Sequence, residues 1–291
     1  MTAYPSQYPP HPGVRPRPAA PPPALVVVAH GSRDPRALAT ALRLLERVRA
    51  LRPGLPVHLG HIELNAPLLP DTLDVLAASG AGSAVLVPLL FGRGHHVTRD
   101  IPDAATAAPL PARVADPLGP HPLLVDALHA RLTEAGWQPP RDADDRRRSA
   151  VVLAAAGSRA PASRAGTERI AALLAARLGV PVVPAYASAA APTVTEAVRA
   201  LAARGRTRVA VASCFTAPGR FAAECADAAP GTVSDPLGTH PAMARLLLHR
   251  YDQALRTPAP VAGPATPVAA PAALVAAQAA LVAAQAALAT A

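Results

Sequence analysis

The sequence predicts an α/β protein of two tandem lobes, each with a parallel sheet flanked by helices, related by internal duplication. Three observations support this prediction. A Gly-Ser-Arg motif follows an apolar run at 31–33 and again at 157–159. An Asp-Pro-Leu-Gly-X-His-Pro motif occurs at 116–122 and again at 235–241. Around these motifs, short apolar runs alternate with segments whose apolar residues have helical spacing.

The first lobe begins with the continuous apolar run Leu25–Ala29, which is typical of a parallel strand buried on both faces. Ala37–Leu51 follows with apolar residues at helical spacing, and Pro53-Gly54 ends that helix. The remaining elements are expected in the same alternation, as strands at Leu55–Ile62, Ala84–Phe91 and Arg113–Ala115 and helices at Leu68–Ala78, Asp100–Ala107 and His121–Glu134. The last of these helices is expected to close the lobe.

The second lobe repeats this order, with strands expected at Val151–Ala155, Val182–Ala187 and Arg208–Phe215. The predicted domains are therefore residues 24–135 and 149–256, joined by a polar linker at 136–148. Arg141–Arg148 carries all the charged residues of the linker, so we expect the linker to be solvated and mobile.

The two ends of the chain differ from this core in composition. Residues 1–23 hold nine prolines and lack a secretory signal, which predicts a disordered, extended arm. Residues 257–291 are a low-complexity tail rich in alanine and proline, with Leu274, Leu281 and Leu288 at heptad spacing. Three leucines without flanking charges are too few for a coiled coil, so no chemistry is assigned to the tail.

Composition excludes several functional classes. The chain has 291 residues, enough for about two domains. Its net charge is +9, but all the basic residues are scattered arginines and aromatic residues make up 3%, which argues against nucleic-acid binding. The central region has no apolar stretch long enough for a membrane span. Cys214 and Cys225 are interpreted as reduced thiols, which predicts a cytoplasmic protein.

Three polar residues follow successive strands of the first lobe. His30 comes after the first strand, Glu63 after the second and His96 after the third. Because parallel strands end at one edge of a sheet, these side chains are expected to converge there. Two imidazoles and a carboxylate suit a divalent ion such as Fe²⁺, Co²⁺, Ni²⁺ or Zn²⁺.

The second lobe lacks all three candidate ligands. The sequence places Ala156, Ser188 and Arg220 at the equivalent positions, although both repeated motifs are retained. This pattern indicates that the motifs are structural and that His30, Glu63 and His96 are functional. A lone histidine is more often a core residue bonded to a carbonyl, and a lone glutamate a solvated one, so the interpretation depends on the three together.

Other polar residues have structural interpretations. Asp34 and Asp100 each lie near a proline at the start of a predicted helix, so helix capping is preferred for both. A role for Asp100 in supporting a metal site is the alternative. His121 and His240 occupy the same place in both lobes, which favours structure over catalysis, and a buried structural role is preferred for His61.

Three motifs in combination resemble a known family. They are His-Gly-Ser-Arg-Asp-Pro at 30–35, Ile-Glu-Leu-Asn-Ala-Pro at 62–67 and Gly-His-His-Val-Thr-Arg-Asp-Ile-Pro at 94–102. With them the chain resembles the sirohydrochlorin chelatases, which are class II tetrapyrrole metal chelatases. The resemblance covers residues 24–256, although the second lobe matches only in its framework.

The resemblance implies two flavodoxin-like lobes and a metal-insertion reaction. Fe²⁺, or Co²⁺ as a close second, would enter sirohydrochlorin with release of two protons, for sirohaem or cobalamin biosynthesis. The metal is then a substrate, and no organic cofactor is expected. The family's two metal-site histidines fall on His30 and His96 and its acidic residue on Glu63, although the neighbouring His95 leaves open which imidazole binds.

The expected partner is a polycarboxylated tetrapyrrole, whose carboxylates need cations. Guanidinium groups bind carboxylates in bidentate fashion, and Arg33, Arg93, Arg99 and Arg220 are the candidates nearest the predicted edge. No nucleic-acid or membrane partner is expected, and the sequence leaves monomer and homo-oligomer equally open. The alternative function is a carrier that binds a divalent metal or a tetrapyrrole without turnover.

Overall fold

The structure of the protein is a computed structural model that describes residues 21–257. The predictions for residues 1–20 of the proline-rich arm, and for the tail with its heptad leucines, fall outside the described residues. Within the described range, every helix is too short or too polar to cross a membrane.

The first lobe is built on a four-stranded parallel sheet in the order β2-β1-β3-β4. Its strands are β1 (Ala24–Ala29), β2 (Val57–His61), β3 (Ala84–Pro88) and β4 (Ala112–Val114). The central strand β1 is fully buried along Leu25–Val28, as its continuous apolar run predicted. This strand order is the flavodoxin-like one, so the predicted fold class is confirmed.

Helices cover both faces of this sheet because alternate residues of each strand point to opposite sides. Leu25 and Val27 belong to a core shared with α1 (Pro35–Leu51). Val26 and Val28 belong to a separate core on the other face. That second face is covered by α2 (Leu69–Ala78) and α3 (Ile101–Ala107).

The second lobe repeats the arrangement with the strand order β6-β5-β7. Its strands are β5 (Ser149–Ala155), β6 (Val182–Tyr186) and β7 (Arg208–Ser213), and its helices include α6 (Pro161–Leu178), α7 (Val194–Ala202) and α8 (Arg220–Asp227). A single parallel bridge between Val211 and Val233 stands where the first lobe has β4. The internal duplication is therefore visible in the strand order of both sheets.

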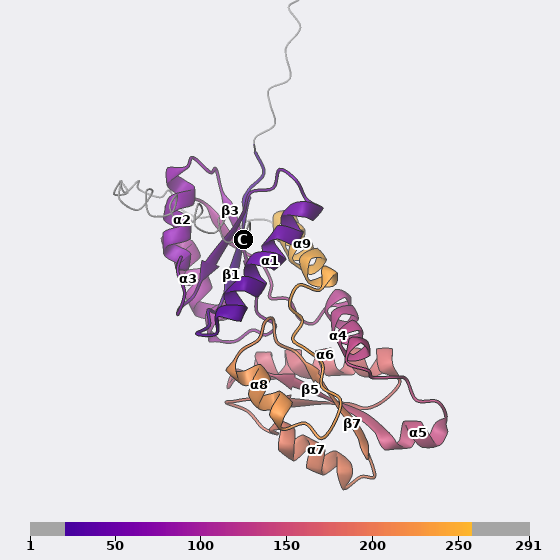
Figure 1. Cartoon of the computed structure of the whole chain (residues 1–291). Coiled ribbons are helices and arrows are strands. Elements are labelled where there is room, and N and C mark those ends of the chain that lie inside the picture. The colour runs from indigo at the N-terminus through magenta and orange to yellow at the C-terminus, as the bar shows by residue number, and fades with distance from the viewer. Residues whose placement is uncertain (1–20, 258–291) are drawn as a thin grey trace, which may run out of the picture.

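The closing helices of the two lobes are exchanged. α4 (Pro122–Glu134) follows the first sheet in the chain but packs against α6 and β7 of the second lobe. α9 (Pro241–Arg256) follows the second sheet but packs against α1 and β3 of the first (Figure 1). The expectation that the helix at 121–134 closes its own lobe was therefore wrong.

Specific contacts fix α9 on the first lobe. The Arg52 guanidinium donates to both oxygens of Asp252, at 2.6 and 2.8 Å. The Tyr251 hydroxyl donates to the Pro23 carbonyl oxygen at 2.7 Å. The exchange therefore joins residues that lie 200 and 228 positions apart in the chain.

The repeated Asp-Pro-Leu-Gly-X-His-Pro motif is the segment that crosses between lobes. The backbone N–H of Leu118 and that of Leu237 each donate at 2.8 Å to the chain that follows β3 and β7. His121 and His240 then cap α4 and α9, each accepting a backbone N–H through its Nδ1 atom, at 3.1 and 3.2 Å. The predicted structural role of both histidines is confirmed.

The segment between the lobes differs from the solvated linker that its charge predicts. Residues 143–148 form a short helix, α5 (Ala143–Arg148), with Asp142 as its N-cap. Asp145 is only 5% exposed and forms an ion pair with Arg208 at the start of β7. Because a buried carboxylate needs such a partner, the linker is anchored on the second sheet.

Candidate functional site

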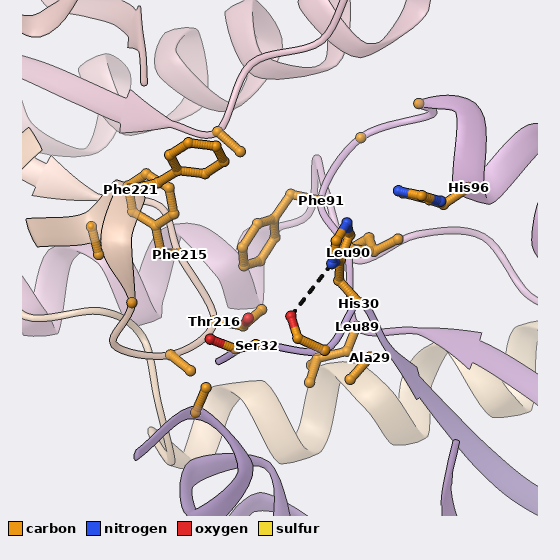
Figure 2. A pocket seen from close by; sticks show the side chains of 18 of the residues that line it. Ala29, His30, Ser32, Leu89, Leu90, Phe91, His96, Phe215, Thr216 and Phe221 are labelled. Atoms are coloured by element: carbon orange, nitrogen blue, oxygen red, sulfur yellow. Dashed lines mark hydrogen bonds between the residues drawn. The ribbon is translucent and has the colours of Figure 1, made fainter. Parts of the chain in front are cut away.

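A cleft of about 1510 Å³ lies between the two lobes, at the carboxyl ends of both sheets. It is lined by the loops that follow β1, β3, β5 and β7, and Figure 2 shows side chains from both lobes facing it. Its volume exceeds the roughly 300–1,000 Å³ of common small-molecule sites. His30, Glu63 and His96 all line it, so the structure brings the three predicted residues into one cavity.

The loop after β1 depends on Gly31. This residue has φ +102°, and a Cβ atom there would overlap the carbonyl oxygen of Glu63. The Ser32 N–H donates to the Asn65 side chain at 2.6 Å, which ties together the loops that carry His30 and Glu63. A residue without a side chain is therefore what allows these two loops to approach each other.

The Asp34 side chain ends this loop by accepting the Arg36 backbone N–H at 2.9 Å, so its predicted capping role is confirmed. The Arg36 guanidinium also contacts Asp34, and its hydrogen bond lowers the pKa of that carboxyl. Asp34 is thus a charged cap that already has its own partner.

His30 lies next to both of its predicted companions. Its Nε2 atom is 3.6 Å from Oε1 of Glu63, and its ring centroid is 4.7 Å from that of His96, with the rings nearly perpendicular. The three side chains are partly exposed to the cleft. Within residues 21–257, no three His, Cys, Asp or Glu side chains are arranged so that they could hold a metal ion together. The three side chains are therefore neighbours in one cleft, without the arrangement of a preformed metal site.

His96 is positioned by an irregular helix start. The turn η1 (His96–Asp100) is π-helical, and the Ile101 N–H that follows it donates to the His96 carbonyl. This geometry brings Nδ1 of His96 to 2.5 Å from Oδ2 of Asp100. The Asp100 side chain makes no capping hydrogen bond to α3, so the preferred capping interpretation was wrong. Asp100 holds the His96 imidazole instead.

His95 and His96 differ in their surroundings. The His95 side chain is 75% exposed and lies 3.4 Å from the other oxygen of Asp100. The His96 side chain is 33% exposed and packs edge-to-face with His30. His96 is thus the imidazole that the fold places beside His30.

The second lobe repeats the backbone of this site without its ligands. The Glu63 N–H donates to the His30 carbonyl at 3.0 Å, and the Ser188 N–H donates to the Ala156 carbonyl at the same distance. Gly157, with φ +91°, approaches Ser188 as closely as Gly31 approaches Glu63. Ala156 and Ser188 are therefore the structural counterparts of His30 and Glu63, as the repeat predicted.

The third counterpart differs by one residue from the prediction. The Thr98 N–H donates to the Gly94 carbonyl, and the Ala223 N–H donates to the Gly219 carbonyl in the same way. Counting from these paired glycines, Phe221 is the counterpart of His96 in the second lobe, and Arg220 is the counterpart of His95. The assignment of Arg220 to the position of His96 was therefore wrong.

An aromatic surface faces the histidines across the cleft. Phe91, Phe215 and Phe221 all line the cleft, and they are the only phenylalanines in the sequence (Figure 2). Two of them belong to the second lobe, which supplies an apolar wall where the first supplies imidazoles. Sequence reasoning missed this wall, although each of the three follows the carboxyl end of β3 or β7.

The predicted arginines separate into two groups. Arg33 and Arg220 line the cleft, and Arg220 contacts Glu224 at 3.1 Å and the Phe221 ring at 4.5 Å. Arg93 and Arg99 are outside its lining, because Arg93 pairs with Asp116 and Arg99 lies on an exposed part of η1.

A further arginine, Arg159, also lines the cleft. Sequence reasoning missed it, although it is the arginine of the second Gly-Ser-Arg motif. The repeat itself was therefore the signal that could have found it.

Two buried titratable groups lie on the walls of the cleft. His61 is 2% exposed with Nδ1 at 3.1 Å from the Pro67 carbonyl oxygen, and burial lowers its pKa, in agreement with a structural role. Burial raises the pKa of Cys214 to about 12, which keeps the group a neutral thiol. Cys214 and Cys225 are both free, as expected.

Curated relatives match part of the chain. A sirohydrochlorin cobaltochelatase of Methanococcus aeolicus is 34% identical over 79 residues, 27% of this chain and 55% of the relative. The chain thus spans about half the length of that relative. A sirohydrochlorin cobaltochelatase of Sulfolobus acidocaldarius is 32% identical over 113 residues, 38% of this chain and 90% of the relative.

Solved structures match the two-lobed fold. SirB from Bacillus subtilis with Fe³⁺ is 23% identical with a TM-score of 0.68, over 80% of this chain and 95% of that one. A sirohydrochlorin chelatase SirB from Bacillus subtilis subspecies spizizenii, in complex with cobalt, is 22% identical with a TM-score of 0.65, over 79% and 94%. The family model CbiX matches residues 24–135 and 150–254, which include both lobes. By this match the chain belongs to the CbiX family.

Proposed function

We propose that the protein is a sirohydrochlorin chelatase, which inserts Fe²⁺ or Co²⁺ into sirohydrochlorin and releases two protons. The observation that supports this most is the position of His30 beside both Glu63 and His96, in a cleft open between two lobes. Relatives that are named sirohydrochlorin cobaltochelatases add support for the same reaction class.

In this proposal the histidines deliver the metal. The contact between Nδ1 of His96 and Asp100 leaves Nε2 of His96 free to bind a cation. Nε2 of His30 faces Glu63, so imidazole and carboxylate donors lie on one side of the cleft. Two imidazoles and one carboxylate would leave coordination positions for the nitrogens of the macrocycle, which suits a metal that must be passed on.

The two protons need acceptors in the cleft. The free-base macrocycle loses two pyrrole N–H protons as the M²⁺ ion enters, so charge balances when both reach solvent. Imidazoles bind a metal only when neutral, and an imidazole that has released its metal is free to accept one proton. Glu63, with a half-exposed side chain, takes the second proton and passes it to solvent.

The aromatic wall supports a planar substrate. Phe215 and Phe221 face the first lobe across the cleft, where a flat conjugated ring would pack on aromatic faces. The macrocycle would then lie between this wall and the histidines.

The free cysteines also support the proposed cytoplasmic location.

The test is a set of anaerobic turnover assays with metal-free sirohydrochlorin and Fe²⁺, Co²⁺ or Ni²⁺, followed by absorbance. A His₂–carboxylate set discriminates weakly between Fe²⁺ and Co²⁺, so we expect multiple turnovers with both. A spectral change that stops at one macrocycle per chain would instead show a carrier. The proposal fails if none of the three metals is inserted faster than in buffer alone.

A further inference from the structure

The repeated Gly-Ser-Arg motif has two positions that the fold explains. Gly31 and Gly157 both adopt positive φ where a side chain would overlap the neighbouring loop. Ser32 and Ser158 both accept the backbone N–H two residues further on, at 3.1 Å in each lobe. The first two residues of the motif therefore do the same structural work in both lobes.

The arginine at the third position of the motif has no comparable structural role in either lobe. Arg33 and Arg159 are exposed and line the cleft, and among the described residues neither guanidinium has a carboxylate within 4.0 Å. Arg36 and Arg220, nearby in the chain or in the cleft, are engaged with Asp34 and Glu224. Arg33 and Arg159 are thus cations that remain available to a ligand.

The two arginines approach the cleft from opposite lobes. A Cβ atom on Gly94 would lie 3.5 Å from Oγ of Ser158, so the loop carrying Arg159 packs against the loop that leads to His96. A Cβ atom on Gly219 would lie 3.8 Å from Oγ of Ser32, so the loop carrying Arg33 packs against the start of α8. The motif arginines therefore flank the cleft at two related places.

The charge of the cleft points to an anionic ligand. The carboxylates that line it are Asp34, already paired with Arg36, and Glu63, which lies beside His30. Guanidinium groups bind carboxylates through two parallel hydrogen bonds, which fixes orientation as well as position. Two such groups, one on each lobe, match a ligand with several carboxylates around its edge.

We propose that Arg33 and Arg159 are a pair of carboxylate-binding residues that orient the macrocycle between the lobes. Arg159, from the lobe without metal ligands, holds the edge nearest the loop of His96. This inference rests on the proposed function, since it takes sirohydrochlorin as the ligand. It also gives Arg159 a role in a lobe where the counterparts of His30, Glu63 and His96 carry no imidazole or carboxylate.

The test measures the equilibrium Kd of metal-free sirohydrochlorin by absorbance titration, together with KM and kcat. Arg159→Met should weaken binding about tenfold and raise KM with little change in kcat, because it removes a charged hydrogen-bond donor. Arg159→Lys should recover part of the affinity, and Arg33→Met should resemble Arg159→Met. Arg204→Met, which removes an equal charge from an exposed site on the second lobe outside the cleft, should bind as the wild type does.

A methyl-esterified sirohydrochlorin separates carboxylate binding from a structural defect. Arg159→Met should bind the ester no more weakly than the wild type does, whereas a distorted cleft would weaken both ligands. Wild-type affinity for the free acid in Arg159→Met, or equal losses for acid and ester, would overturn the inference. Binding without turnover by the wild type would end the proposed function and leave the arginine pair standing, and no binding at all would overturn both.

Discussion

The two lobes share a backbone and differ in the side chains that face the cleft. His30, Glu63 and His96 on one lobe correspond to Ala156, Ser188 and Phe221 on the other. The hydrogen bond that joins the first two positions has the same length in both, so the backbone does not require the polar groups. One copy of the duplicated fold therefore carries the candidate metal ligands, while the other contributes two of the three phenylalanines that line the cleft.

The largest effect is expected from His30→Ala. Insertion should fall about a thousandfold, because the variant removes the imidazole that contacts both other candidate ligands. The melting temperature should stay within a few degrees of the wild type, because the side chain is 41% exposed. Initial rates and thermal unfolding measure the two effects.

The matched control for this prediction is Ser188→Ala, at the counterpart of Glu63 in the second lobe. This serine lies outside the cleft lining, so its rate should be close to that of the wild type. A wild-type insertion rate in His30→Ala would remove His30 from the metal site.

The next effect tests the backbone that both lobes share. Gly31→Ala and Gly157→Ala should each destabilise the protein by about 3 kcal/mol, because each forces positive φ on alanine and brings a methyl group onto a carbonyl oxygen. Urea unfolding measures the loss. Gly166→Ala, in α6 with open space around it, should be neutral or stabilising. Losses limited to the first lobe would show that the two turns are not equivalent.

A smaller effect is expected from Asp100→Asn. Asparagine caps helices as well as aspartate does, so stability should not change if capping were the role. The apparent metal affinity should fall about 10- to 100-fold, because the carboxylate that holds the His96 imidazole is lost. Rates as a function of metal concentration measure this affinity.

Asp103→Asn, on the exposed side of α3, is the control and should leave metal affinity unchanged. An Asp100→Asn variant with both the metal affinity and the stability of the wild type would contradict the role of Asp100 in holding His96 and return it to a capping role.

The smallest effect concerns the histidines that begin the exchanged helices. Burial, with His249 and Arg250 nearby, lowers the pKa of His121 to about 4. Between pH 6.5 and about 4 the unfolded chain therefore binds more protons at this residue than the folded chain does, and stability falls as the pH falls. His121→Asn keeps a cap but cannot titrate, so its melting temperature should decline less across this window.

The counterpart His240 has a pKa that is lowered by burial as well, so His240→Asn should change the pH profile in the same direction. Melting curves at several pH values compare the two variants. An unchanged slope in His121→Asn would show that other groups control the acid sensitivity.

The spacing of apolar residues along the sequence predicted the individual strands and helices. The buried run at β1 and the amphipathic α1 have periodicities that local residues set. The exchange of α4 and α9 could not be predicted, because both helices follow the same motif and both present apolar faces. The sequence around each helix does not indicate which of the two parallel sheets that helix will cover.

The candidate site shows a similar division. His30, Glu63 and His96 were predicted because strand ends meet at one edge of a sheet. Asp100 was misassigned because a π-helical turn starts four residues earlier and redirects its side chain to His96. Proximity in sequence also suggested Arg93, but the fold pairs it with Asp116 instead.

The exchanged helices also determine when each half of the chain is able to fold during synthesis. The first sheet is complete early, yet the surface between α1 and β3 stays uncovered until α9 emerges from the ribosome. An apolar surface left open for so long is prone to associate with other chains. Cutting the gene between the lobes would therefore yield two fragments, each carrying the helix that covers the other fragment's sheet. The first would carry α4 and the second α9, and only co-expression of the two would restore both cores.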